Sequence, residues 1–392
     1  MTTALPCQRD LFDMPRDVCF LNAAAWAPLS KATVELGREA VGRKGQPWRL
    51  DAAFQQEQCE AARAAAARVI GADADDVAII PSISYGVATA ARILGLDPRG
   101  TVIVLADDHA SPVLEWKARP DGLAMTVRTV TVAEDRDWTA AVLGAIEEEA
   151  GEGLALVSIS SVHWADGGLV DMDRVSAATK RHGVPLLVDA THAVGVVDCD
   201  VARVDPDFLL FPTYKWLLGP YGRSFLYVAK RWQDGIPLEQ TMSGRVRVRA
   251  EDPVYFTDTN WVDSARRYDM GQRDFFVSLD MARHGMELVH GWGRAALEAR
   301  LAMLTRRITD GLRDGDLPVE TLSEAVRAPH ILSAGFSEGM PDGLPAALKE
   351  RDVFVAPRLG RLRIAPHAYN DEADCDRFVE ALSDAMKGLG AA

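Results

Sequence analysis

One lysine stands where the surrounding residues predict burial. Lys215 lies in "FPTYKWLLGPYG" (211–222), directly after a short apolar run and directly before a glycine–proline turn. Lysine side chains are mostly solvated, whereas Tyr214 and Trp216 on either side of this one favour an enclosed position. A lysine in such a place can form a Schiff base with a carbonyl cofactor.

Other polar residues stand at the ends of predicted strands. His109 follows "TVIVLA", Asp189 and His192 lie in "VDATH" after "PLLV", and Ser84 lies in "PSISYGVATAA", where a strand gives way to a helix. Ligands of parallel α/β sheets collect at the carboxyl ends of the strands. These residues are therefore candidates for one site together with Lys215.

The chemistry of this set suits pyridoxal phosphate. Lys215 can hold the cofactor as a Schiff base. A carboxylate such as Asp189 can keep the pyridine nitrogen protonated, which makes the ring an electron sink for a substrate carbanion. The helix that begins near Ser84 can bind the phosphate through its free N–H groups, and an aromatic ring can stack on the pyridine. Spacing alone does not decide the cofactor.

The elements that must position these residues alternate along the chain from about residue 55 to residue 230. Helical segments are separated by short apolar runs predicted as strands at 77–80, 101–106, 154–160, 184–190, 207–211 and 224–229. Nearly continuous apolar strands between helices predict an α/β fold with a mainly parallel sheet covered on both faces.

After about residue 260 the pattern changes. One long or two consecutive helices, two short strands and a last helix predict a smaller α+β domain. We expect a large domain at 16–260 and a small domain at 261–392, completed by residues 1–15. A chain of 392 residues accommodates two such domains.

Composition excludes several classes of protein. The formal net charge of −14 argues against nucleic-acid binding. The five cysteines are widely spaced and include no CxxC pair, which argues against disulfides and zinc and favours a cytoplasmic location. Neither a signal peptide nor an apolar stretch of membrane-spanning length is recognisable, so no membrane association is expected. Walker A, HExxH, GxSxG and GxGxxG motifs are absent, which disfavours nucleotide, metal-hydrolase and dehydrogenase functions.

The stretch "LLVDATHAVGVVDCDVARVDPDFLLFPTYKWLLGPYGRSFLYVAKR" resembles the core of the class V aminotransferase family of pyridoxal-phosphate enzymes. That family includes cysteine desulfurases, kynureninases and isopenicillin N epimerase-like proteins. "LNAAAWAPLS", "DDHASPVLEW" and "LRIAPHAYNDEADCDRFVEAL" are similar to further family segments, so the resemblance covers about residues 16–388. It implies fold type I, with a mainly parallel seven-stranded sheet in the large domain, pyridoxal phosphate as cofactor, and a homodimer with sites near the subunit boundary.

The resemblance also implies roles for individual residues. Lys215 would form the Schiff base and shuttle the α-proton, and Asp189 would pair with the pyridine nitrogen. His192 would hydrogen-bond near the phenolic oxygen, and His109 would stack on the ring. Further residues are implied at the phosphate (Ser84, the backbone around Ile83 and Tyr85, and Tyr214) and at the substrate (Arg363, which would bind its carboxylate, with Arg358 as competitor, and Trp164, which either lines the pocket or packs in the core).

Two departures from the family narrow the function. Cysteine desulfurases carry a catalytic cysteine ahead of the closing arginine motif, and "RDVFVAPRLGRLRIAP" has none. Many members carry Gly-Thr where this chain has Gly271-Gln272, so the phosphate contact from the neighbouring subunit is absent or made by Gln272 or Arg273. We expect an enzyme that acts on a small amino acid, by transamination or C–S/C–C lyase chemistry. Epimerisation or racemisation, or a non-catalytic binding protein of the same fold, are the alternatives.

Overall fold

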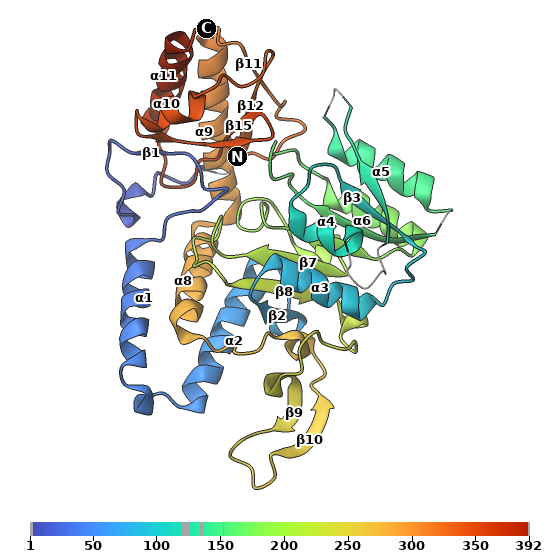
Figure 1. The fold of residues 1–392 in the computed structure, drawn as a ribbon. Coiled ribbons are helices and arrows are strands. Elements are labelled where there is room, and N and C mark those ends of the chain that lie inside the picture. Colours follow the sequence, from blue (N-terminus) through green and yellow to red (C-terminus); the bar gives the residue numbers. More distant parts are fainter. Residues whose placement is uncertain (1–2, 119–124, 134–135, 152, 391–392) are drawn as a thin grey trace.

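A seven-stranded sheet forms the centre of the larger part of the protein (Figure 1). The computed structural model describes residues 3–118, 125–133, 136–151 and 153–390. The strand order is β2-β8-β7-β6-β5-β3-β4, in which β8 is antiparallel to both of its neighbours and the other pairs are parallel. The strands are β2 (Val77–Ile80), β3 (Thr101–Leu105), β4 (Thr126–Val130), β5 (Leu154–Ser160), β6 (Leu186–Asp189), β7 (Phe208–Pro212) and β8 (Ser224–Val228). The predicted α/β fold with a mainly parallel sheet is confirmed.

Helices cover both faces of this sheet, which explains the continuous apolar strands. In β3, for example, Ile103 packs in the larger core with α2, α5, α6 and α8, whereas Val102 and Val104 pack in a second core with α3 and α4. Neighbouring residues of a strand point to opposite faces, so burial of both faces removes any polar alternation. The helices of this part are α1 (Lys31–Lys44), α2 (Ala52–Val69), α3 (Ile83–Leu94), α4 (Ala110–Lys117), α5 (Trp138–Glu149), α6 (Met172–His182), α7 (Val201–Val204) and α8 (Phe276–Trp292).

The C-terminal part combines helices with the four-stranded antiparallel sheet β11-β12-β15-β14 and lies at the top of Figure 1. Its strands are β11 (Val319–Thr321), β12 (Leu332–Phe336), β14 (Ala356–Arg358) and β15 (Arg361–Ile364). Its helices are α9 (Arg294–Asp314), α10 (Leu344–Lys349) and α11 (Glu372–Gly388). Helices α8 and α9 are separate because Gly293, at φ +80°, breaks the helical path between them.

The N-terminal segment packs against this C-terminal part. Strand β1 (Cys19–Phe20) pairs in parallel with β13 (Val353–Phe354), and the buried Arg9 donates to Asp374 of α11 at 2.9 Å. The domain limits at 16–260 and 261–392 stay a prediction, since α8 itself packs against α1 and α2 of the larger part.

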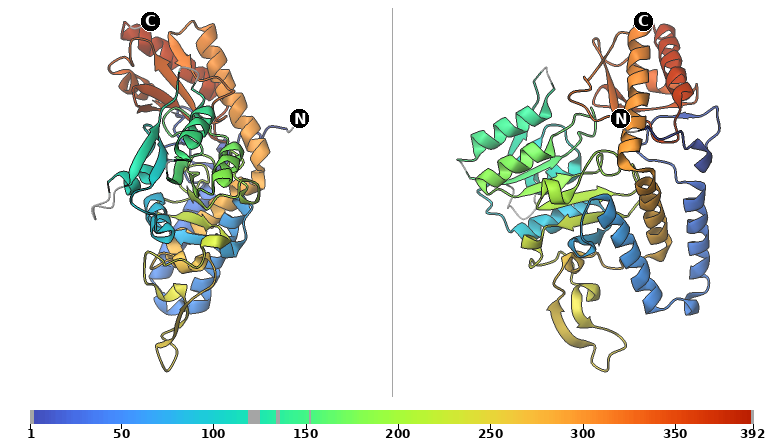
Figure 2. Two further views of the ribbon diagram at one scale, coloured as in Figure 1. Left: turned by 90° about the vertical axis from the view of Figure 1, so that its right-hand side faces the viewer. Right: turned by 180° about the vertical axis from the view of Figure 1, so that it is seen from behind.

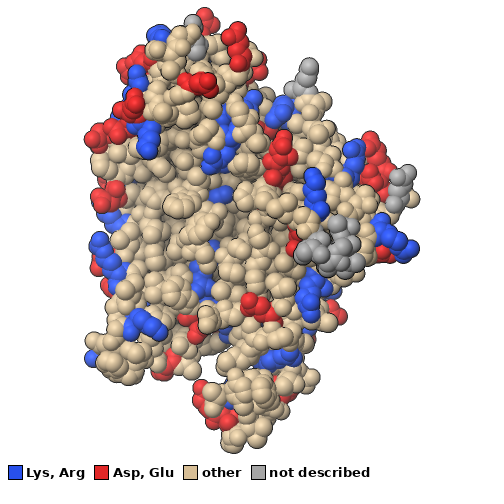
Figure 3. Space-filling view, in the orientation of Figure 1, with Lys and Arg blue, Asp and Glu red and all other residues tan. Residues whose placement is uncertain are grey.

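A hairpin of β9 (Arg245–Val248) and β10 (Phe256–Trp261) stands away from the body, at the bottom of Figure 1 and in both views of Figure 2. "RVRVR" therefore lies on a largely exposed strand, as its alternation indicates. Acidic and basic side chains are interspersed on the face in Figure 3, around a central area with few charges.

One buried ion pair joins α2 to the segment that leads from the hairpin to α8. Arg63 donates to both carboxylate oxygens of Asp269, at 3.0 and 2.7 Å, and both side chains are inaccessible to solvent. Asp269 also accepts from the backbone N–H of Ile79 in β2 at 2.8 Å. This carboxylate therefore ties three separate segments beneath the sheet.

We expect Asp269→Asn to lower the free energy of unfolding by about 3–5 kcal/mol, because it leaves the buried Arg63 with only the half-buried Glu60, at 3.3 Å, as a counter-ion and removes the partner of Arg273. Urea denaturation measures the change. Asp97→Asn is the matched control, since Asp97 pairs with Arg99 at the surface and such pairs contribute about 0–1 kcal/mol. Equal destabilisation by the two substitutions would contradict a structural role for the buried pair.

Candidate active site

Lys215 lies in a tight loop that leaves the carboxyl end of β7. Thr213 closes this loop: its Oγ1 donates to the carbonyl of Pro220 at 2.9 Å, and its carbonyl accepts from the N–H of Gly219 at 2.8 Å. A Cβ at Gly219 would lie 2.6 Å from the Thr213 side chain, so only glycine permits this approach. The loop turns the Lys215 side chain into the protein, where 7% of the residue remains exposed.

The environment of Lys215 favours a neutral amine. Its Nζ lies 3.0 Å from Nε2 of His192 and 5.5 Å from the ring centre of Tyr214. Burial lowers the pKa of Lys215 to about 7; the positive charge of Arg363 contributes in the same direction, and Asp189 opposes it. A neutral amine is the nucleophilic form that attacks a carbonyl carbon.

Asp189 reaches the same edge of the sheet from the neighbouring strand. It is the last residue of β6, which pairs with β7 in a register that places Asp189 opposite Leu210. Its carboxylate is buried, and Oδ1 accepts from the backbone N–H of Thr191 at 2.9 Å. The parallel register therefore brings Asp189 and Lys215 into the wall of one cavity.

Most of the predicted residues line this cavity. They are Ile83, Ser84, His109, Trp164, Asp189, His192, Tyr214 and Lys215. Trp164 therefore lies at the cavity and not in the core; its Nε1 donates to the carbonyl of Asp107 at 2.7 Å. Its ring meets that of His109 edge to face, with 5.9 Å between centres. Burial raises the pKa of Tyr214, which keeps its hydroxyl protonated.

The start of α3 determines which N–H groups are free for the expected phosphate contacts. Ser82 caps this helix, and its Oγ accepts from the N–H of Tyr85 at 3.2 Å. The Tyr85 N–H is thus already used, and Tyr85 does not line the cavity. Ile83 and Ser84 keep the N–H groups of the first helical positions at the cavity wall, where an anion is favoured.

Close packing holds this helix end beside the strand that carries Lys215. A Cβ at Gly86 would lie 2.2 Å from a methyl carbon of Leu210 in β7. Helix α3 can therefore approach β7 only because this residue is glycine, and its N-terminus is fixed relative to Lys215.

Arg363 and Arg358 lie behind the cavity wall. Their guanidinium carbons lie 6.0 and 5.8 Å from the ring centre of Trp164, and neither residue lines the cavity itself. Arg363 is 1% exposed, and its Nη1 donates to the carbonyl of Trp164 at 2.6 Å. Burial lowers the pKa of Arg363 to about 9, and Arg358 contributes to the shift.

Further residues at the cavity were not predicted as site residues. They are Ser82, Ser111, Ser160, Thr191, Tyr221, Gly222 and Ser224, with Pro81 and Pro212. Two of them lie in motifs that the sequence analysis discussed: Thr191 in "VDATH" and Tyr221 in "GPYG". Their position in these motifs could have identified them as site residues. The Oγ1 of Thr191 is buried and has no hydrogen-bond partner among the described residues.

Residues 20–361 match the family described as Aminotransferase class-V. The chain belongs to this family. Relatives of the class-V enzyme include an uncharacterized aminotransferase, YcbU, of Bacillus subtilis, which is 26% identical over 83% of this chain and 84% of that protein. The isopenicillin N epimerase of Streptomyces clavuligerus is 27% identical over 83% of this chain and 84% of its own. A kynureninase of Salinispora tropica is 34% identical over 77% of this chain and 67% of its own.

Solved structures share the fold of this class-V enzyme. The apo cysteine desulfurase of Thermococcus onnurineus NA1 superposes with a TM-score of 0.83 at 19% identity, over 99% of this chain and 100% of that chain. The cystine C–S lyase C-DES in complex with cysteine persulfide has a TM-score of 0.82 at 19% identity, over 94% and 98%. The predicted fold type I, the enzyme class and pyridoxal phosphate as cofactor are confirmed.

The residues present fit this cofactor. The cavity offers a neutral lysine amine, a buried carboxylate at Asp189 and free helix N–H groups at Ile83 and Ser84. The Thr191 hydroxyl, which has no hydrogen-bond partner among the described residues, can donate to an oxygen atom of a bound group. Among the described residues, no group of three or more His, Cys, Asp or Glu is placed to hold a metal ion. In the same part of the chain, no helix is long and apolar enough to cross a membrane.

We expect the rate at which the cofactor-free protein captures pyridoxal phosphate to rise with pH and level off just above pH 7. Below about pH 7 the Lys215 amine is protonated and unreactive; above it the amine is free. An ordinary lysine, with its pKa near 10.4, would keep gaining reactivity to much higher pH. Stopped-flow absorbance measures the rate, and a continued rise up to pH 10 would contradict the lowered pKa.

Proposed function

We propose that this pyridoxal-phosphate enzyme acts on a small amino acid through Lys215, by transamination or by cleavage of a C–S or C–C bond. The observation that carries the proposal is the buried, near-neutral Lys215 amine, in one cavity wall with Asp189 and His192. This combination of an amine nucleophile, a carboxylate and a helix N-terminus supports each contact that the cofactor needs.

Pyridoxal phosphate, when bound, supplies an electron-accepting ring that takes up the charge left when a bond at the substrate's α-carbon breaks. Asp189 would hold a proton on the pyridine nitrogen, because a buried carboxylate gains from an adjacent cation. The N–H groups of Ile83 and Ser84 would bind the phosphate. Lys215 would hold the aldehyde carbon and, once displaced by substrate, would move the proton at the α-carbon.

Arg363 is the candidate partner for the substrate carboxylate. Its guanidinium is buried, its Nε has no hydrogen-bond partner, and no Asp or Glu among the described residues pairs with it. A buried charge without a counter-ion is costly, and a substrate carboxylate would offset that cost with charge-assisted hydrogen bonds. Trp164 lines the cavity, with its ring centre 6.0 Å from the Arg363 guanidinium, so we expect the Trp164 side chain to move when substrate binds.

The cysteines support a reaction other than persulfide formation. All five are free thiols, and none lines the cavity. Burial raises the pKa of the Cys19 and Cys199 thiols to about 12, so the thiolate form that attacks sulfur is rare. Five free thiols also support a cytoplasmic location.

The proposal includes a homodimer with its active sites near the subunit boundary. Arg273 donates to Asp269 and to Gln56 of its own chain. This leaves Gln272, which stands at φ +55°, as the residue to reach a partner's phosphate site.

We expect Lys215→Ala to abolish covalent attachment of the cofactor, because no other amine lines the cavity among the described residues. Borohydride reduction followed by peptide mass spectrometry measures the attachment. Lys230→Ala is the matched control: this lysine is exposed, and its loss should leave the modified peptide unchanged. A modified peptide elsewhere in the Lys215→Ala variant would move the role to another lysine.

We expect Arg363→Gln to raise KM for amino-acid substrates by about ten- to a hundredfold, as loss of a charge-assisted pair costs about 1.5–3 kcal/mol. Cofactor affinity should stay unchanged. A panel of amino acids, with products identified by mass and by chirality, provides the substrate and separates transamination, cleavage and epimerisation. Unchanged KM in Arg363→Gln together with a raised KM in Arg358→Gln would assign the carboxylate to Arg358.

A further inference from the structure

His192 has a different partner at each of its ring nitrogens. It lies in the turn after β6 and is buried. Its Nε2 faces Nζ of Lys215 at 3.0 Å, inside the cavity. Its Nδ1 faces the indole Nε1 of Trp216 at 3.3 Å, on the side away from the cavity. Trp216 itself does not line the cavity.

The chemistry of these partners determines where His192 carries its proton. An indole N–H can only donate, so Nδ1 of His192 must accept. Burial, together with the nearby Lys215 and Arg363 charges, lowers the pKa of His192 well below its usual value, so the ring is neutral and has one proton. With Nδ1 as acceptor, this proton lies on Nε2 and points at the lysine.

We propose that Trp216 is a positioning residue that fixes the His192 tautomer, so that Nε2–H donates to the free amine of Lys215. The inference rests on the proposed role of Lys215 and deepens it. A neutral amine has one lone pair, which accepts this bond, whereas a protonated amine has only donors and would meet another N–H. The arrangement thus selects the reactive form of the lysine.

Two histidines from the C-terminal part hold the backbone of this pair. Nε2 of His330 donates to the carbonyl of His192 at 2.6 Å, and Nε2 of His367 donates to the carbonyl of Trp216 at 3.2 Å. The N–H of Ala368 donates to Nδ1 of His367 at 2.7 Å, which leaves its proton on Nε2. Burial lowers the pKa of His330 to about 3 and that of His367 to about 4, so both stay neutral.

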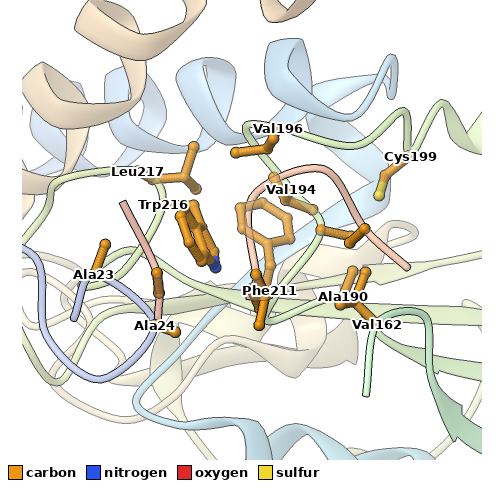
Figure 4. Packing of buried hydrophobic residues seen from close by; sticks show 14 of the residues in the cluster. Ala23, Ala24, Val162, Ala190, Val194, Val196, Cys199, Phe211, Trp216 and Leu217 are labelled. Atoms are coloured by element: carbon orange, nitrogen blue, oxygen red, sulfur yellow. The ribbon is translucent and has the colours of Figure 1, made fainter. Parts of the chain in front are cut away.

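The indole ring is equally constrained. It is 1% exposed, stacks on His367 with 5.7 Å between ring centres and meets His330 edge to face at 4.2 Å. Figure 4 shows it packed among Leu217, Ala23 and Ala24. Rotation that would remove the indole N–H from His192 is therefore blocked by packing on several sides.

Nitrogen-15 NMR of histidine-labelled protein, with and without pyridoxal phosphate, tests the tautomer directly. The shifts separate a protonated from an unprotonated ring nitrogen. We expect His192, assigned by its loss in His192→Ala, to carry its proton on Nε2 in the wild-type chain. A proton on Nδ1 would overturn the proposal, whether or not Lys215 binds the cofactor.

The second arm uses Trp216→Phe, which keeps an aromatic ring and removes the N–H. His192 can then present the Nε2 lone pair to a protonated lysine, so the pH midpoint of pyridoxal-phosphate capture should move up by about one unit. Asp189, Arg363 and Arg358 also influence the charge of Lys215. The ring of Tyr214 faces Nζ at 5.5 Å, and all four residues are unchanged in this variant.

The controls separate this role from general damage to the fold. Trp116→Phe is the matched variant, because Trp116 is equally buried and its indole donates to Ser158 at 3.0 Å, away from His192; its midpoint should not move. In a His192→Ala background, Trp216→Phe should add no further shift. An equal shift in that background, or in Trp116→Phe, would overturn the proposal. Failure of wild-type protein to capture the cofactor would instead overturn the proposed function.

Discussion

The desolvation of one amine is the constraint on which the rest of the site depends. Removing a lysine ammonium from water without a close counter-ion favours its neutral form. A carboxylate in hydrogen-bond contact would reverse this effect; Asp189 acts on Lys215 only as a through-space charge, and the group in contact with Nζ is the neutral His192. Because Nζ of Lys215 contacts a neutral histidine and not a carboxylate, its neutral, nucleophilic form is favoured.

Much of the fold was predictable because its signal is local. Strands buried on both faces are continuous apolar runs, and β2, β3, β5, β6, β7 and β8 were each recognisable in that way. Strand β4 was not, since it lies at the edge of the sheet and most of its residues are exposed or half-buried. An edge strand is determined by the neighbour with which it pairs, and no short window of sequence contains that neighbour.

The site residues also divide into those that a local sequence signal predicts and those that depend on distant parts of the chain. Asp189 ends β6, and His192 and Lys215 each come three residues after the end of a strand, so position at a strand end was sufficient to bring them together. The predicted phosphate contacts depend on the residue at which α3 begins; the cap is Ser82, so the N–H of Tyr85 already has a partner. His330 and His367 could not be predicted as neighbours of the site, because they come from the C-terminal part and contact Trp216 only through tertiary packing.

That packing gives the boundary between the two parts of the protein a direct influence on the chemistry. His192 and Trp216 belong to loops after β6 and β7, but the histidines that bind their carbonyls precede β12 and follow β15. Arg363, which lowers the pKa of Lys215, is itself in β15. A displacement of the small sheet would therefore weaken the hydrogen bond from His330 to the His192 carbonyl. It would at the same time move the positive charge of Arg363 away from Lys215. Loss of the Arg363 charge favours a protonated and unreactive amine, so we expect the site to be most reactive when the two parts are closely packed.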